Sequence, residues 1–236
     1  VCKDNGITKP IYVYPHGIED FWVPKRRVVN EGQPIKFLHI GEPSPRKDGQ
    51  LVVDTFAKIF GNNPDYQLTL KCHNSNTTRM YNKNNEFVTP DTIYSNIKII
   101  TDEYPEEQLL SLYHSHHVLL YPTWGEGFGF IPLQGLATGM PVISTYDWCH
   151  YGKYLGPLKL KSKLTDETLP KSVGDDYIGK MFKPDAKHLE DQMYEAVINF
   201  KAYSGYYYAQ ANNIHKEYNW DQLTKNAFDH LVKKFS

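Results

Sequence analysis

The chain has 236 residues, of which 40% are apolar, and its formal net charge at pH 7 is −1. This length and apolar content suffice for one well-buried core or two small ones. The near-neutral charge gives no electrostatic reason to expect nucleic acid or anionic lipid as a partner, and no apolar run approaches the ~18 residues of a membrane span.

The first part of the chain reads as a strand followed by a linker. A short strand is predicted at 11–14, and residues 20–34, which contain two prolines and a glycine, are typical of a linker. A compact apolar strand follows at Ile35–Ile40. We therefore divide the chain into an interdomain-type strand and linker at 1–34 and a single domain at 35–236.

Beyond residue 35 the predicted strands and helices alternate. A helix is predicted at Gly49–Phe60, because Leu51, Val52, Phe56 and Ile59 fall on one face and a glycine follows. The remaining elements, in the order of the chain, are strands at 66–72 and 97–100, a helix at 105–114, a strand at 118–121, a helix at about 131–138, a strand at 141–144, an irregular region at 146–177, a strand at 177–182, and three helices at about 185–202, 205–217 and 221–235.

Strands that alternate with helices of this length indicate a parallel sheet with helices on both faces, which is an α/β, Rossmann-like architecture. Ligands of such sheets bind outside the carboxyl ends of the strands. Gly41, Thr101–Asp102 and Gly125–Gly129 each come directly after a predicted strand, as do residues 72–74. We therefore expect these turns to meet at one edge of the sheet and to form a binding site there.

The stretch TWGEGFGFIPLQGLATGMPVIST at 123–145 is the most informative part of the chain. It follows an apolar strand and reads as a glycine-rich turn, a helix, a further glycine and a second strand. Gly127 and Gly129 would let backbone amides approach a ligand at the start of the helix, where the helix dipole favours an anion. The stretch therefore predicts an anion site built largely from backbone.

This stretch resembles the donor-site signature of the retaining, GT-B-fold glycosyltransferases of family 4. The family's first acid corresponds to Glu126, but Gln134 stands where the family has its second glutamate. FLHIGEPSPRKDGQLVVDTFAKI and IGKMFKPDAKHLEDQM resemble further segments of the same family in the same order. The resemblance implies that residues 35–236 are the nucleotide-sugar donor-binding domain, the C-terminal half of a GT-B fold.

The resemblance also implies a reaction, the transfer of a hexosyl group from a nucleotide sugar, such as a UDP- or GDP-sugar, to an acceptor with retention of anomeric configuration. Glu126 would be the catalytic residue, whose carboxylate forms hydrogen bonds with hydroxyls of the transferred sugar, and Gln134 would accept from the ribose. The remaining donor-binding residues that it implies are Gly41, Arg46, Lys47, Thr101, Asp102, Gly127, Phe128 and Gly129.

No metal is expected, because the glycine amides and the two cations Arg46 and Lys47 already supply positive potential for a diphosphate. His114, His116 and His117 lack a cysteine or carboxylate at metal-ligand spacing. Family members carry an N-terminal domain that holds the acceptor. We therefore expect an acceptor-binding domain or partner, without which the domain at 35–236 is not expected to turn over.

Two departures from the family keep other functions open. Glu42 occupies a position where the family has Arg or Lys, and Gln134 replaces a glutamate. A non-catalytic nucleotide-sugar-binding or interaction module with a decayed donor site would show such changes, and a GT-B-fold sugar-nucleotide epimerase is a further alternative. Cys2, Cys72 and Cys149 form no paired pattern, which favours a reducing compartment and a cytoplasmic location.

Overall fold

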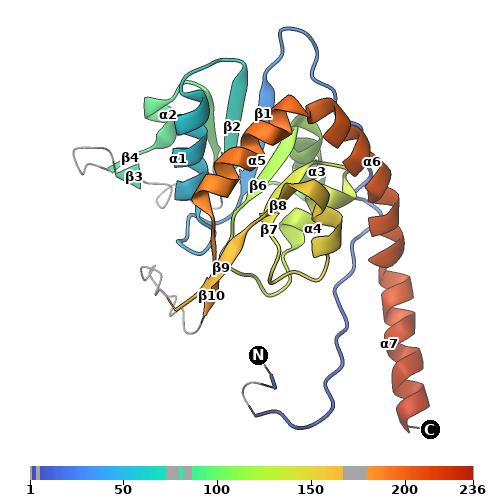
Figure 1. Ribbon diagram of the computed structural model, residues 1–236. Helices are drawn as coiled ribbons and strands as arrows, with labels where there is room; N and C mark the ends of the chain where they lie inside the picture. Colours follow the sequence, from blue (N-terminus) through green and yellow to red (C-terminus); the bar gives the residue numbers. More distant parts are fainter. Residues whose placement is uncertain (1, 4–5, 73–79, 82–86, 167–179, 236) are drawn as a thin grey trace.

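The computed structural model describes residues 2–3, 6–72, 80–81, 87–166 and 180–235. Within these residues the chain forms a six-stranded parallel sheet in the order β5-β2-β1-β6-β7-β8, flanked by helices (Figure 1). The strands of this sheet are β1 (Ile35–Ile40), β2 (Tyr66–Lys71), β5 (Ile97–Ile100), β6 (Val118–Tyr121), β7 (Val142–Thr145) and β8 (Lys159–Leu160). Two small antiparallel pairs join β3 (Met80–Tyr81) to β4 (Phe87–Val88) and β9 (Ser162–Thr165) to β10 (Met181–Pro184).

The helices lie on both faces of the sheet. The chain moves outward in one direction from β1 to β2 to β5 and in the other from β6 to β7, so right-handed crossovers place the connecting helices on opposite faces. Helix α5 packs with α1 on one face, and α4 packs with α6 on the other. The helices are α1 (Gly49–Phe60), α2 (Pro90–Ile93), α3 (Glu106–Ser115), α4 (Phe130–Ala137), the 3₁₀ helix η2 (Gly152–Leu158), α5 (Ala186–Ile198), α6 (Phe200–Glu217) and α7 (Trp220–Phe235).

The core follows from the apolar central strands. All residues of β6 and β7 are buried, as are Phe37 and Leu38 of β1, because helices cover both faces of these strands. Helix α1 buries Val52, Val53 and Phe56 against them. Asp48 caps the start of the helix, where its carboxylate accepts a hydrogen bond from the backbone N–H of Leu51. The predicted bounds of the helix are confirmed.

Two predicted strands differ from the structure by more than one residue at an end. Residues 11–14 form no strand, since Ile11 and Val13 are exposed and pair with no described strand edge. The strand predicted at 177–182 is observed as β10, Met181–Pro184, while residues 177–179 lie outside the described part of the chain. The region 146–177, predicted to be irregular, contributes η2, β8 and β9, and β8 extends the main sheet.

The N-terminal segment runs beside the C-terminal helix. The backbone N–H of Ile18 donates to the carbonyl of Tyr218 at 2.7 Å, and the side chain of Tyr12 packs on His230. Helix α7 extends away from the body of the domain, with the N-terminal segment alongside it (Figure 1). The segment thereby reaches the carboxyl edge of the sheet, where Tyr14 and His16 border the cleft described below.

Candidate donor-binding site

The site lies between β1 and β6, where the direction of the strand order reverses. Strands β1 and β6 are neighbours, but the chain leaves them toward opposite sides, and ligands of open α/β sheets bind outside the carboxyl ends of such a strand pair. The loop after β1 and the loop after β6 are joined there. The backbone N–H of Trp124 donates to the carbonyl of Arg46 at 2.9 Å, and its indole N–H donates to Asp48 at 2.8 Å.

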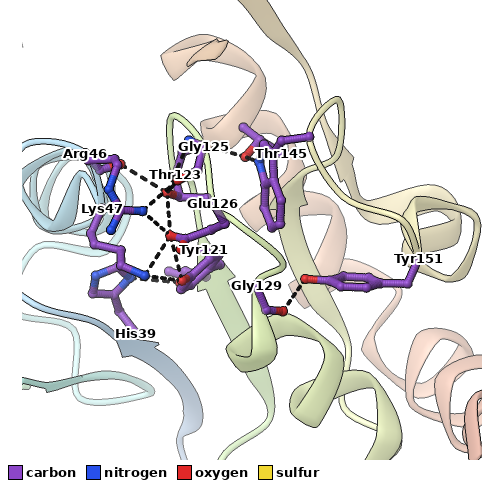
Figure 2. Close-up of polar contacts among 12 residues, drawn as sticks. His39, Arg46, Lys47, Tyr121, Thr123, Gly125, Glu126, Gly129, Thr145 and Tyr151 are labelled. Carbon is purple, nitrogen blue, oxygen red and sulfur yellow. Dashed lines mark hydrogen bonds and ion pairs between the residues drawn. The ribbon is translucent and has the colours of Figure 1, made fainter. Parts of the chain in front are cut away.

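A single carboxylate oxygen organises the joined loops. The Oε1 atom of Glu126 lies 2.6 Å from the guanidinium of Arg46 and 2.6 Å from the ammonium of Lys47. It also accepts hydrogen bonds from the hydroxyls of Tyr121 and Thr123, each at 3.0 Å. Figure 2 shows these four side chains converging on Glu126. The two cations are thus paired with an acid.

The environment shifts the pKa values of both charged partners. Burial by itself would raise the pKa of the Glu126 carboxyl, but the hydrogen bond and charge of Lys47, together with the charge of Arg46, lower it below its ordinary value. Burial also lowers the pKa of Lys47, against the opposing effect of Glu126. The Lys47 ammonium also donates a hydrogen bond to the hydroxyl of Tyr121 at 2.5 Å.

Next to this cluster is a cleft of about 790 Å³. Five of the ten residues predicted for the site line it, namely Lys47, Glu126, Gly127, Phe128 and Gly129. The cleft opens at the start of α4, so the backbone of 127–129 and the N-terminus of that helix face the same space as the Lys47 ammonium. An anionic group in the cleft would therefore meet a cation and the positive end of a helix together.

The other predicted residues lie around the cleft. Arg46 contacts Glu126 and donates to the carbonyl of Gly125 at 2.7 Å, but it is not part of the cleft lining. Gly41 lines a neighbouring hollow of about 360 Å³, and its Cα hydrogen faces the stem of Lys47, where an added Cβ would lie 3.4 Å from Cγ. Thr101 and Asp102 directly follow β5 and line neither space.

Gln134 is placed on the side of α4 that faces α3. Its side-chain oxygen lies 3.1 Å from the hydroxyl of Tyr113, whose single proton is shared between this oxygen and the carbonyl of Ile131. Gln134 is not part of the cleft lining. Its predicted contact with a ribose stays a prediction.

Sequence reasoning missed the wall formed by the turn after β7. Asp147, Trp148, Cys149 and His150 all line the cleft. The signal was present, because this turn also follows a parallel strand and must lie at the carboxyl edge. The indole N–H of Trp148 donates to the hydroxyl of Thr145 at 2.8 Å, which fixes the ring beside the glycine turn.

Gly129 packs closely against that wall. Its φ of +81° is a left-handed conformation, and an added Cβ would lie 2.5 Å from the Trp148 ring and 2.6 Å from the Tyr151 hydroxyl. The same Tyr151 hydroxyl donates to the carbonyl of Gly129. Glycine is therefore required here by both the backbone and the available space.

Two of the three histidines near the start of β6, His116 and His117, have structural roles. His116 bonds to the carbonyl of Leu112 and the hydroxyl of Thr69, each at 2.8 Å, and His117 accepts from the backbone N–H of Lys36 at 2.9 Å. Burial lowers the pKa of His116 and of His117 to about 4, so both rings are neutral at pH 7. Among the described residues, no group of three or more His, Cys, Asp or Glu side chains is arranged to hold a metal ion.

Two further properties bear on the setting of the protein. In the part of the chain that the structure describes, no helix combines the length and the apolar character needed to cross a membrane. Cys2, Cys72 and Cys149 are all described, and each is a free thiol.

Comparison with known sequences gives no match to a protein family, and none to a curated protein. Comparison with solved structures gives clear matches. Sucrose-phosphate synthase from Thermosynechococcus elongatus aligns with 94% of this chain and 52% of its own, at 16% identity and a TM-score of 0.64. WaaG, a glycosyltransferase involved in lipopolysaccharide biosynthesis, aligns with 92% of this chain and 55% of its own, at 14% identity and a TM-score of 0.60.

A third match is Anabaena HepE, solved in complex with UDP, which aligns with 85% of this chain and 49% of its own at 10% identity and a TM-score of 0.56. The chain thus spans about half the length of the solved structures that it matches. Identities this low show the fold. The chain has the α/β, Rossmann-like fold expected of the C-terminal half of a GT-B glycosyltransferase.

Proposed function

We propose that the chain is the donor-binding part of a retaining, family 4 glycosyltransferase that transfers a hexosyl group from a nucleotide sugar to an acceptor. The observation that carries the proposal is the cleft beside β1 and β6. There the Lys47 ammonium, the Glu126 carboxylate and the start of α4 border one space of about 790 Å³. The glycosyltransferase fold of the solved relatives, one of them with UDP, supports the same assignment.

The chemistry needs a stabilised leaving group, because transfer from a nucleotide sugar releases a nucleoside diphosphate. Lys47 and the backbone amides of Gly127, Phe128 and Gly129 would carry that negative charge, with Arg46 beside them. These donors act without a divalent metal in our proposal. The charges of Arg46, Lys47 and Glu126 sum to +1, while Asp147 adds a negative charge to the lining of the cleft. Attraction of an anion therefore depends on Lys47, the backbone amides and the start of α4.

Glu126 would exchange partners when the donor binds. In the structure its Oε1 atom accepts from Arg46, Lys47, Tyr121 and Thr123 at once. A diphosphate that attracts Lys47 would remove one of the four contacts to this oxygen. The carboxylate would then accept hydrogen bonds from hydroxyls of the transferred sugar, which is the catalytic role that we assign to it.

The nucleoside part would extend from the cleft toward the hollow beside Gly41. That hollow is bordered by Lys71, Glu103 and Tyr104, next to Thr101 and Asp102 in the loop after β5. We assign base or ribose contacts to this region. Gln134 would form a hydrogen bond with the ribose from the other side, in place of its hydrogen bond with Tyr113.

One observation favours a second candidate, a nucleotide-sugar-binding module without catalysis. The side-chain oxygen of Gln134 is already engaged by the Tyr113 hydroxyl, as expected for a helix residue with a structural role. The two candidates differ in one assay. A catalytic domain hydrolyses its donor slowly in the absence of acceptor, whereas a binding module retains the donor intact.

The acceptor would be held by another domain or partner, since the matched solved structures are about twice as long as the aligned region. Closure between two such domains would exclude water from the donor. Residues 1–236 alone should therefore bind donor and hydrolyse it slowly, and rates of roughly 1 per second or more with an acceptor would contradict this division of roles.

A thermal-shift panel of UDP, GDP, ADP and their sugar derivatives tests the proposal. One nucleotide should raise the Tm, and its sugar derivative should raise it further because Glu126 gains a partner. No rise with any nucleoside diphosphate would contradict the proposed function.

A further inference from the structure

A second charged hollow lies at the opposite edge of the sheet from the donor cleft. It has a volume of about 260 Å³ and lies between the loop that leads into β1 and the junction of α3 with β6. In Figure 1 this loop is the blue segment at the top of the view. Lys25, Arg26, Arg27 and Lys36 line the hollow, and none of the residues that line it is an aspartate or glutamate. Its charge is therefore of one sign, although the whole chain is nearly neutral.

Arg27 forms a buried cation at the base of this hollow. Its side chain is 3% exposed, and its guanidinium donates to the carbonyls of Tyr113, His116 and Thr138 at 2.8–2.9 Å. These acceptors are neutral, and no carboxylate among the described residues pairs with Arg27. Burial lowers its pKa to about 9, because removal from water disfavours the charged form. The carbonyls lie at the C-terminal ends of α3 and α4, whose dipoles balance part of this charge, and an anion nearby would add to that compensation.

The cations at the mouth of the hollow are available to a ligand. Lys25 and Arg26 are exposed and Lys36 is half-buried, and none of the three forms an ion pair with a described residue. The histidines of the hollow are less suited to bind an anion. His117 uses Nδ1 to accept from Lys36, and burial lowers the pKa of both His114 and His117, the charges of Arg27 and Lys25 adding to the effect for His114.

We propose that this hollow binds a phosphoryl group, as inorganic phosphate, pyrophosphate or a phosphate ester. Arg26, Lys25 and Lys36 would contact the oxygens, because guanidinium and ammonium groups form strong charge-assisted hydrogen bonds with phosphate. Arg27 would act through its charge alone, since its donors are occupied. The volume is below the ~300–1,000 Å³ of sites for larger ligands, which favours a small anion or a headgroup. The site is distinct from the donor cleft, which lies at the other ends of the strands.

Calorimetric titration with pyrophosphate tests the proposal. All measurements use the Lys47→Ala background, so that the donor cleft contributes little to the heat. The variant Arg26→Gln/Lys36→Met should bind pyrophosphate at least tenfold more weakly than the Lys47→Ala parent. A matched control, Lys98→Met, removes an exposed lysine on β5 and should bind like the parent. Circular dichroism checks folding, and Lys25→Met replaces the double variant if that one unfolds.

A second arm separates the two sources of a phosphoryl group. Sedimentation with vesicles that contain phosphatidic acid in neutral lipid, compared with neutral vesicles, reports binding to a lipid headgroup. Vesicle binding that is lost in Arg26→Gln/Lys36→Met assigns the site to a membrane headgroup, and pyrophosphate binding without vesicle binding assigns it to a soluble ligand. Absence of both, or equal affinity in parent and double variant, overturns the proposal.

Discussion

Lys47 is the residue at which a binding role of the loop after β1 can be told apart from that of an ordinary surface loop. Its ammonium contacts Glu126 and the hydroxyl of Tyr121, and it borders the cleft beside the glycine turn. A lysine held in this way is already positioned, so a diphosphate would gain a charged contact at a small cost in side-chain entropy. Its contribution to binding should therefore be measurable.

Replacing Lys47 with alanine should weaken binding of the preferred nucleoside diphosphate by about 1.5–3 kcal/mol, the range for a hydrogen bond to a charged group. The dissociation constant, measured by calorimetry, checks this. Lys98→Ala is the matched control, because Lys98 is exposed on β5 away from the cleft. Unchanged affinity in a folded Lys47→Ala variant would show that the lysine does not touch the ligand.

Glu126 competes with the diphosphate for the two cations, so its charge should affect nucleotides and nucleotide sugars differently. In Glu126→Gln, the free nucleoside diphosphate should bind about tenfold more tightly, or about 1.4 kcal/mol, since no carboxylate neutralises Arg46 and Lys47. The nucleotide sugar should lose its advantage over the nucleotide. Calorimetry with both ligands checks this, and a parallel loss for both would refute the partner exchange.

The same substitution predicts a pH dependence of stability. The folded pKa of Glu126 lies below the unfolded value of 4.5, so the ion pairs stabilise the fold fully above pH 4.5 and lose this effect as the pH falls through the folded pKa. Wild type should thus be more stable than Glu126→Gln at pH 7, by about 1–3 kcal/mol, and the difference should shrink below pH 4.5. Urea denaturation at several pH values measures it, and a difference that grows in acid would contradict the argument.

At the scale of elements, the regular parts of the fold were predictable from sequence. Strands β1, β5 and β6 and helix α1 were predicted with their observed bounds, because apolar periodicity and glycine breaks mark them clearly. The strand predicted at 11–14 was wrong. Its apolar residues fit the pattern of a strand, but in the structure they face solvent beside α7, and the sequence pattern is the same in both cases. The partner of Gln134 was not predictable either, since Tyr113 lies on a different helix and only the packing of α3 on α4 brings them together.

The turn between β6 and α4 should be intolerant of a side chain at one glycine and tolerant at another. Gly129→Ala forces a left-handed backbone and a contact 2.5 Å from the Trp148 ring, so the free energy of unfolding should fall by about 2–4 kcal/mol. Gly127→Ala is the matched control in the same turn, because an added Cβ there meets no atom within 4 Å. Urea denaturation of both variants checks this; equal stability would mean that the wall formed by Trp148 and Tyr151 does not enclose the turn.

At the scale of the whole molecule, the donor cleft and the cationic hollow lie at opposite ends of the strands. The donor cleft lies at the carboxyl ends of β1 and β6, where the switch in winding opens a space between two loops. The cationic hollow lies where the same two strands begin. Among the described residues, the donor cleft includes a helix N-terminus and a carboxylate, whereas the lining of the cationic hollow includes neither.

The central claim is that the donor cleft binds a nucleoside diphosphate through protein groups alone. Calorimetric titration of residues 1–236 with the nucleotide selected by thermal shift, in buffer with EDTA and again with excess Mg²⁺, tests it most directly. We predict one nucleotide per chain and dissociation constants that agree in the two buffers, because Lys47, Arg46 and the amides of 127–129 supply the positive potential. Binding that collapses in EDTA and returns with Mg²⁺, or no binding in either buffer, would contradict the account.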